Sequence, residues 1–89
     1  IGWSDVGSWD TAGKFWPRDK HGNFVRGRLA AIDSENNIVF NEGKPPIVCV
    51  GVKGLMVVAS EHGILICDQA RSQDIRKIPP LLAKNSLQP

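Results

Sequence analysis

The residues best suited to chemistry stand at the start of the chain, in the segment Trp3-Ser4-Asp5-Val6-Gly7-Ser8-Trp9. Asp5 supplies a carboxylate close to a glycine, and Ser8 can begin a short helix by accepting a hydrogen bond from a following backbone N–H. Because a helix N-terminus and a bound cation both attract anions, this arrangement suits a metal-bound phosphate. A carboxylate that only caps a turn would give the same pattern, so the residues alone leave both interpretations open.

Other catalytic patterns are missing from the sequence. Neither His21 nor His62 stands in a recognisable Ser-His-Asp order, and there is no glycine-rich phosphate loop of the P-loop type. Cys49 and Cys67 lie inside apolar stretches and lack the paired spacing of a zinc site. We therefore expect two buried free thiols in a cytoplasmic protein, with neither a disulfide nor a metal between them.

Composition and charge limit the classes of partner. The chain has 89 residues, of which 42% are apolar and 22% charged, and its net charge is +2. This is enough for one small globular domain. The basic residues are dispersed, without the stripe that is typical of nucleic-acid binding. No apolar run reaches the ~20 residues of a membrane span, and the first residues do not resemble a signal peptide. We expect partners that are neither nucleic acid nor membrane.

Short strands are predicted to make up most of the chain. After Phe24, apolar runs recur about every nine residues with clusters of turn-forming residues between them, as in an all-β unit. The expected strands cover residues 29–32, 38–40, 47–52, 55–59 and 64–67. The run 47–52 is apolar on both of its faces, so we expect both faces to be covered, by the sheet folded on itself, by the C-terminal helix or by a partner outside this chain.

Helices are predicted near the two ends of the chain. Gly13 and Pro17 limit a first helix to roughly two turns. A second helix is expected to begin at Asp68 or Ser72 and to stop near Lys77, before two prolines that open a fresh turn. The predicted fold class is thus mainly β. It is a small β-rich domain, β-helix-like or a folded sheet of about five short strands, with an N-terminal helical or turn segment and a C-terminal α-helix.

The segment Gly2-Trp3-Ser4-Asp5-Val6-Gly7-Ser8-Trp9-Asp10 resembles the one that closes the catalytic domain of mannose-1-phosphate guanylyltransferases. That family includes the bifunctional phosphomannose isomerase/guanylyltransferase proteins. The similarity continues, in the order of the family, through residues 22–27, 31–36, 50–58 and 72–78. It covers most of the chain and is therefore more specific than any single motif.

The resemblance implies a function and a division of the chain. Residues 1–23 would be the end of the nucleotidyltransferase domain and a linker, and residues 24–89 a C-terminal β-rich module with a terminal helix, often described as left-handed β-helical. The parent enzyme would make GDP-mannose from mannose 1-phosphate and GTP, with Mg²⁺ as cofactor. Asp5 would be the catalytic residue and metal ligand. Gly7 would belong to the cofactor-binding backbone, where it permits a close approach.

By the same resemblance, the isolated chain would be inactive. The glycine-rich nucleotide signature of the family and the other aspartate that shares the metal are absent from this sequence. Trp3 and Trp9 would pack the motif against the N-terminal catalytic domain, and the apolar β region leaves a homo-oligomer possible. The alternative is a self-contained carbohydrate-binding or oligomerisation module, in which Trp3, Trp9 and Trp16 stack on sugars. Packing in a core is the commoner role of such side chains.

Overall fold

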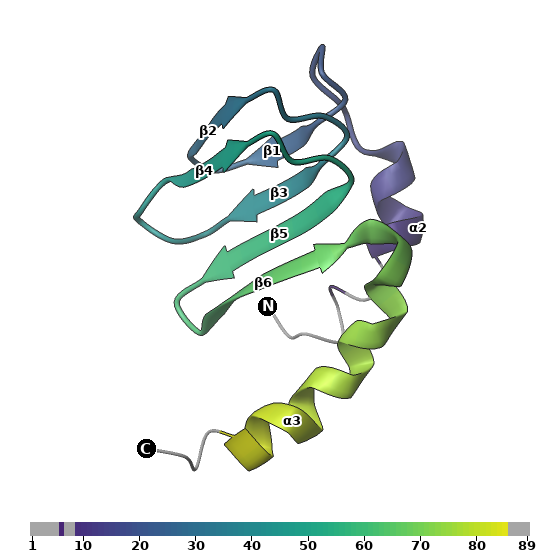
Figure 1. Cartoon of the computed structure of the whole chain (residues 1–89), viewed down its shortest axis with the longest axis vertical. Coiled ribbons are helices and arrows are strands. Elements are labelled where there is room, and N and C mark those ends of the chain that lie inside the picture. Colours follow the sequence, from purple (N-terminus) through teal and green to yellow (C-terminus); the bar gives the residue numbers. More distant parts are fainter. Residues whose placement is uncertain (1–5, 7–8, 86–89) are drawn as a thin grey trace.

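The computed structural model describes residue 6 and residues 9–85, with the side chains of residues 10, 11, 84 and 85 left aside (Figure 1). Within this part the strands form a four-stranded sheet A, in the order β1-β3-β5-β6, and a two-stranded sheet B made of β2 and β4. The strands are β1 (Phe24–Arg26), β2 (Leu29–Ile32), β3 (Ile38–Asn41), β4 (Ile47–Val50), β5 (Leu55–Ser60) and β6 (Gly63–Asp68). The mainly β fold class is confirmed, and the predicted apolar runs are strands.

The chain winds between the two sheets as a β-helix. In sheet A, β1, β3 and β5 pair in parallel, and in sheet B, β2 pairs in parallel with β4. After β1 and again after β3, the chain therefore turns into sheet B and returns to sheet A one position further along. Phe24 pairs with Ile38, and Ile38 pairs in turn with Met56. In this parallel register, equivalent residues of successive coils lie side by side.

Strand β6 ends the winding. After β5 the chain turns and runs back antiparallel to it, so β6 becomes the edge of sheet A. In the described part of the chain, sheet B has no third strand to lie opposite β6. Ile64 and Ile66 of β6 are consequently 70% and 68% exposed, whereas Leu65, on the other face, is buried in the core.

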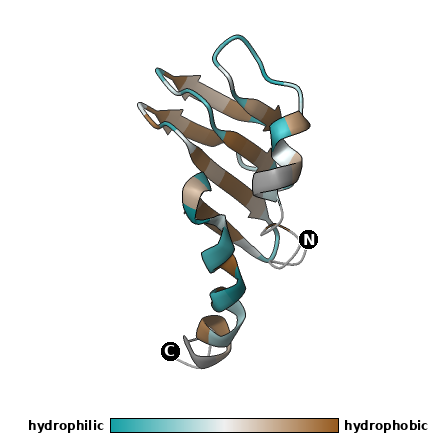
Figure 2. Cartoon of the chain, turned by 90° about the vertical axis from the view of Figure 1, so that its right-hand side faces the viewer, coloured by the Kyte–Doolittle hydropathy of each residue, from teal (hydrophilic) through white to brown (hydrophobic). Residues whose placement is uncertain are grey.

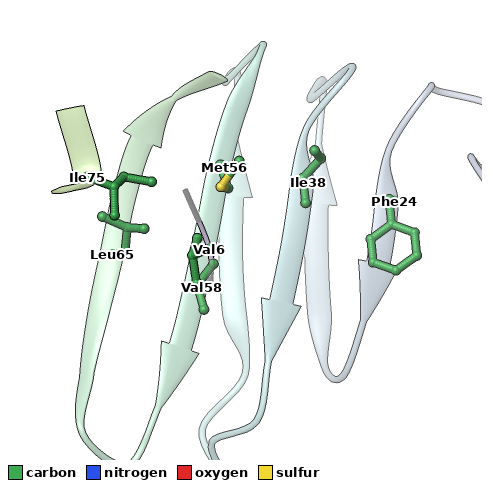
Figure 3. Packing of buried hydrophobic residues seen from close by; sticks show 7 residues of the cluster. All are labelled: Val6, Phe24, Ile38, Met56, Val58, Leu65 and Ile75. Atoms are coloured by element: carbon green, nitrogen blue, oxygen red, sulfur yellow. The ribbon is translucent and has the colours of Figure 1, made fainter. Parts of the chain in front are cut away.

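The main core lies between sheet A and the helices (Figure 3). Seven buried side chains form it: Val6, Phe24, Ile38, Met56, Val58, Leu65 and Ile75. Full burial of a side chain of this kind stabilises the fold by about 1.5–3 kcal/mol. The opposite face of sheet A meets sheet B through smaller side chains, with Val39, Val57 and Cys49 all buried.

A short helix precedes the strands, as predicted. Helix α2 (Trp9–Ala12) passes directly into a 3₁₀ turn, η1 (Gly13–Phe15), and the backbone becomes extended at Trp16. Gly13 is buried against the sheet, since a Cβ placed there would lie 2.9 Å from the Cδ1 of Ile38. This glycine therefore lets the turn approach the core closely.

The C-terminal helical segment has two parts. It begins after Asp68, whose carboxylate accepts a hydrogen bond from the backbone N–H of Ala70 at 2.8 Å, so Asp68 is the predicted cap. The first part, η2 (Gln69–Lys77), consists of two 3₁₀ stretches separated by a kink at Arg71, where φ and ψ are −115° and 20°. Helix α3 (Ile78–Asn85) follows it without a gap. The two prolines thus lie in the first turn of α3, where a missing N–H costs no intrahelical hydrogen bond. None of the described helices is long and apolar enough to span a bilayer.

The strands are mainly hydrophobic (Figure 2), but they are not equally well covered. Strand β5 is buried on both faces, from Met56 to Ala59. The prediction that strand 47–52 is covered on both faces is wrong within the described residues, because Val48 and Val50 are 64% and 63% exposed. The physical reason is that sheet B meets sheet A only with its inner face, and no described element lies over its outer face.

Candidate functional site

The two residues predicted to serve metal and nucleotide, Asp5 and Gly7, lie outside the described residues, as does Trp3. Val6 stands between them in the sequence and is 0% exposed. It belongs to the core cluster that contains Met56 of β5. Val6 therefore packs in the core on sheet A, while the roles of Asp5 and Gly7 stay predictions.

Trp9 packs on this chain's own sheet, while its predicted contact with the N-terminal catalytic domain stays a prediction. Its ring centroid lies 5.2 Å from that of Phe40 and 5.3 Å from that of Trp16. The two indole planes meet at 72°, an edge-to-face arrangement that aromatic pairs favour. Helix α2 is thus held on β3 by aromatic contacts within the chain.

A small cavity lies among these aromatic rings, and we call it the aromatic cavity. Its volume is about 220 Å³, and its lining consists of Trp9, Trp16, Pro17, Phe24, Arg26 and Phe40. The rings of Trp16 and Phe24 are tilted by 41° with their centroids 4.7 Å apart. Tryptophans from the α2–η1 segment therefore form one side of the cavity, and phenylalanines of β1 and β3 form the other.

Arg26 is the charged residue of the aromatic cavity. The pairing of β1 with β3 places it beside Phe40, and its guanidinium carbon lies 5.9 Å from the centre of that ring. This is within the range of a cation–π contact. Arg26 takes part in none of the ion pairs found among the described residues. The cavity thus combines apolar ring surfaces with a cation that is paired with no carboxylate among the described side chains.

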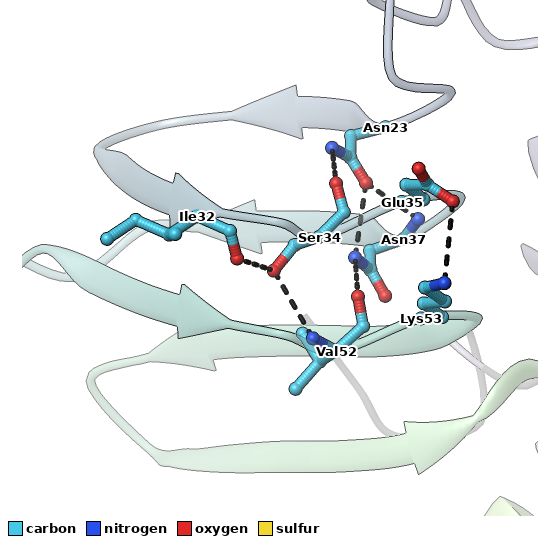
Figure 4. A network of polar contacts seen from close by, with 7 residues as sticks. All are labelled: Asn23, Ile32, Ser34, Glu35, Asn37, Val52 and Lys53. Carbon is cyan, nitrogen blue, oxygen red and sulfur yellow. Dashed lines mark hydrogen bonds and ion pairs between the residues drawn. The ribbon is translucent and has the colours of Figure 1, made fainter.

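Buried asparagines join successive coils (Figure 4). The Oδ1 atom of Asn23 accepts hydrogen bonds from the backbone N–H and from the Nδ2 of Asn37, at 2.9 and 3.1 Å. The Oδ1 atom of Asn37 in turn accepts from the backbone N–H of Leu55, at 2.9 Å. Both amide nitrogens donate to backbone carbonyls, of Ser34 and Val52 respectively. We call Asn23 and Asn37 the asparagine ladder; it satisfies buried backbone groups at the turns.

The turn before each strand of the parallel part of sheet A has the same backbone conformation. Gly22 and Asn36 directly precede the two ladder asparagines, and Gly54 directly precedes Leu55 at the equivalent point of the next coil. All three have positive φ, at 80°, 58° and 69°. The sequence signal is a repeat that the motifs above did not include, with glycine or asparagine, then asparagine or leucine, then an apolar pair. It stands in Gly22-Asn23-Phe24-Val25, Asn36-Asn37-Ile38-Val39 and Gly54-Leu55-Met56-Val57. Taken alone, each copy has the residue types of an ordinary turn.

A larger cavity, of about 730 Å³, lies at the open end of the first coil. Its lining includes apolar Val25 and Leu29 together with Asp19 and His21. The carboxylate of Asp19 accepts hydrogen bonds from the backbone N–H groups of Asn23 and His21, and the first of these lowers its pKa most. In the part of the chain that the structure describes, no three histidine, cysteine or acidic side chains are placed to hold a metal ion. The Asp19 carboxylate therefore stabilises the turn by accepting its backbone hydrogen bonds.

The cysteines are free thiols, as predicted. Cys49 is buried in sheet B, whereas Cys67 of β6 is half-buried. Burial raises the pKa of both thiols. A raised pKa lowers the fraction of reactive thiolate at neutral pH, which suits side chains that only fill space.

Known proteins are similar to this chain in sequence and in fold. Residues 27–80 match a family model described as the MannoseP isomerase/GMP-like β-helix domain. Mannose-1-phosphate guanylyltransferase of Klebsiella pneumoniae is 34% identical over 83 residues, which are 93% of this chain. The alginate biosynthesis protein AlgA of Pseudomonas aeruginosa is 32% identical over 77 residues, which are 86% of this chain. The chain spans about a sixth of the length of these relatives, 17% and 16%.

A solved structure shows the same arrangement of elements. The crystal structure of mannose-1-phosphate geranyltransferase from Thermus thermophilus is similar with a TM-score of 0.73 and 25% sequence identity. The similarity covers 89% of this chain and 24% of that chain. Sequence and fold comparisons therefore point to the same group of proteins.

Proposed function

The chain belongs to the family of MannoseP isomerase/GMP-like β-helix domains, and we propose that it works as the C-terminal part of a nucleotidyltransferase that makes GDP-mannose. The observation that carries this proposal is the similarity to a mannose-1-phosphate guanylyltransferase over 93% of the chain. The coiled fold supports it, because β2 to β6 all lie within the residues that match the family model.

In the proposed reaction, a phosphate oxygen of mannose 1-phosphate attacks the α-phosphorus of GTP. A new P–O bond forms, the bond from the α-phosphorus to the bridging oxygen breaks, and pyrophosphate leaves with that oxygen. Such a transfer depends on holding two anions in line and on offsetting their charge. Bound Mg²⁺ supplies part of that charge.

Asp5 is the proposed Mg²⁺ ligand on this chain. Mg²⁺ is commonly bound through one or two carboxylates together with substrate phosphates, so a single aspartate suits this mode. The remaining ligands would come from the nucleotide and from the N-terminal catalytic domain. Gly7 would allow the backbone to approach the bound ligand closely. The buried side chain of Val6 supports this proposal, because it anchors the segment between the two residues.

The β-helical part would act as the support of this motif. Helix α2 follows the motif directly and rests on sheet A through the contact of Trp9 with Phe40. The asparagine ladder in turn joins the starts of β1, β3 and β5 to one another within sheet A. A rigid support of this kind matters, because a misplacement of about 1 Å at a reacting group can cost ~100-fold in rate.

The experiment is a chimera in which this chain replaces the matching segment of the Klebsiella pneumoniae relative. We expect the chimera to form GDP-mannose and the isolated chain to form none. Asp5→Asn in the chimera should lower kcat by about 100-fold or more and weaken the binding of Mn²⁺, measured by electron paramagnetic resonance. Asp33→Asn is the matched control, since asparagine also tolerates the positive φ of that exposed residue.

Two outcomes would contradict the proposal. One is a folded chimera without activity, and the other is binding of GTP by the isolated chain at micromolar Kd, measured by isothermal titration with Mg²⁺. Assembly of copies through the apolar β region also stays a prediction. Sedimentation of the chimera tests it, and a monomer throughout the micromolar range would speak against it.

A further inference from the structure

The aromatic cavity exists because the cover of sheet A is short at its β1 edge. Helix α2 and the turn η1 together span only Trp9 to Phe15, and β1 is the outermost strand on that side. Trp9 and Trp16 lie over the phenylalanines of the sheet but do not fill the space above them. We propose that the aromatic cavity binds the pyranose ring of a phosphorylated sugar, with the Arg26 guanidinium holding the phosphate.

The size of the cavity selects a single ring. Pockets for drug-sized ligands measure about 300–1,000 Å³, and this cavity measures about 220 Å³. A whole nucleotide is too large for it. The two indole planes meet at 72°, so the walls offer apolar surfaces in two directions. The C–H faces of a pyranose ring match such surfaces, since aromatic rings bury apolar area and leave polar groups at the rim free for water.

The charge of the lining selects an anionic sugar. Of the six described residues in the lining, five are uncharged and the sixth is Arg26. Its guanidinium carries donors in a planar fork that fits a phosphate with two parallel hydrogen bonds. The contact with Phe40 keeps this group at the cavity. A neutral hexose would leave these donors to water, whereas a hexose phosphate would occupy both the rings and the cation.

The choice of mannose 1-phosphate as the probe rests on the proposed function. The experiment follows the indole N–H resonances of the 89-residue chain during titration, with Trp→Phe variants used to assign them. Mannose 1-phosphate should shift the Trp9 and Trp16 resonances in a saturable way at concentrations up to about 10 mM. Mannose and inorganic phosphate, titrated separately, should each bind about tenfold more weakly, because each reaches only half of the site.

Variants separate the role of Arg26 from a general effect of charge. Arg26→Gln should weaken the binding of mannose 1-phosphate by about tenfold, and Arg26→Lys by less, because lysine keeps the charge and loses the fork. Arg28→Gln is the matched control. Arg28 lies outside the cavity and donates to the backbone carbonyl of Lys44 at 3.2 Å, so its removal should leave the Kd unchanged. Spectral dispersion shows whether each variant is folded.

Three results would overturn the inference. They are the absence of saturable shifts at Trp9 and Trp16, equal affinity for inorganic phosphate alone, and an unchanged Kd in folded Arg26→Gln. The first result would mean that the rings only pack against one another. None of these results touches the formation of GDP-mannose by the chimera, so a failure here is distinguishable from a failure of the proposed function.

Discussion

On its helix-covered face, sheet A is held by large apolar side chains such as Ile38 and Met56, whereas the turns before β1 and β3 are held by the amides of Asn23 and Asn37. The first kind of contact has no preferred direction and depends on filled volume. The second is directional, and it ties each coil to the next at fixed points. The comparison indicates that apolar burial supplies most of the stability, while the asparagine ladder sets the register of the winding.

The largest expected effect is on the helix-covered face. Met56→Ala removes a fully buried side chain and should lower the free energy of unfolding by about 2–5 kcal/mol, through lost burial and the cavity left behind. Urea denaturation followed by circular dichroism measures this. Ile66→Ala on the neighbouring strand serves as the control, since that side chain is mostly exposed. Equal losses in the two variants would mean that this face is not the main core.

The asparagine ladder should come next. Asn37→Ala leaves the backbone N–H of Leu55 and the carbonyl of Val52 without their amide partner, at a cost of about 1–3 kcal/mol in the free energy of unfolding. Asn36→Gly is the neighbouring control, because glycine adopts the positive φ of that exposed position freely. If Asn37→Ala costs as much as Met56→Ala, the division of roles between the two regions is wrong.

Two glycines at equivalent turns sharpen the comparison further. Gly22→Ala and Gly54→Ala both place a Cβ at positive φ, which costs about 1–2 kcal/mol. At Gly22 the new atom would also lie 2.1 Å from the Oδ1 of Asn36, whereas nothing lies within 4 Å at Gly54. Thermal unfolding should therefore show the lower Tm for Gly22→Ala. The same Tm for both variants would show that the Asn36 side chain moves aside without cost.

The smallest expected effect is on the free energy of unfolding at acidic pH. Hydrogen bonds from the backbone, above all from Asn23, lower the pKa of Asp19 from its usual 3.8. Because the folded pKa is the lower one, this carboxylate contributes stability above its unfolded pKa and loses the contribution as the pH falls through the folded value. Asp19→Asn should therefore flatten the loss of stability below about pH 4. An unchanged acid slope in urea titrations at several pH values would exclude this role.

Local sequence patterns were enough to place β2 to β6, because an apolar run flanked by turn residues has few other stable conformations, whereas the three-residue strand β1 was not among the predicted strands. The strand ends at 38–40 and 55–59 agree with β3 and β5 to within a residue. The winding itself was not predictable in this way. The backbone N–H of Leu55 bonds to an asparagine 18 residues earlier, and that of Asn37 to one 14 residues earlier, and such unequal spacings leave no local periodicity.

The candidate site also depends on contacts between distant segments that local sequence patterns do not predict. The aromatic cavity depends on the pairing of β1 with β3, which brings Arg26 beside Phe40, and no local pattern announces that neighbourhood. The outer face of β4 was misjudged for a related reason. Val48 and Val50 are as apolar as buried residues, but whether a face is covered depends on which element lies opposite.

The reversal of the chain at β6 also limits growth. Consider a solenoid in which the last strand runs parallel to the others and both sheets end at the same coil. Its end would be a template on which a second copy could continue the sheets. Here the outermost strand runs the opposite way, and sheet B stops short of sheet A. Two such ends do not match strand for strand, so a second copy cannot continue the parallel winding at β6.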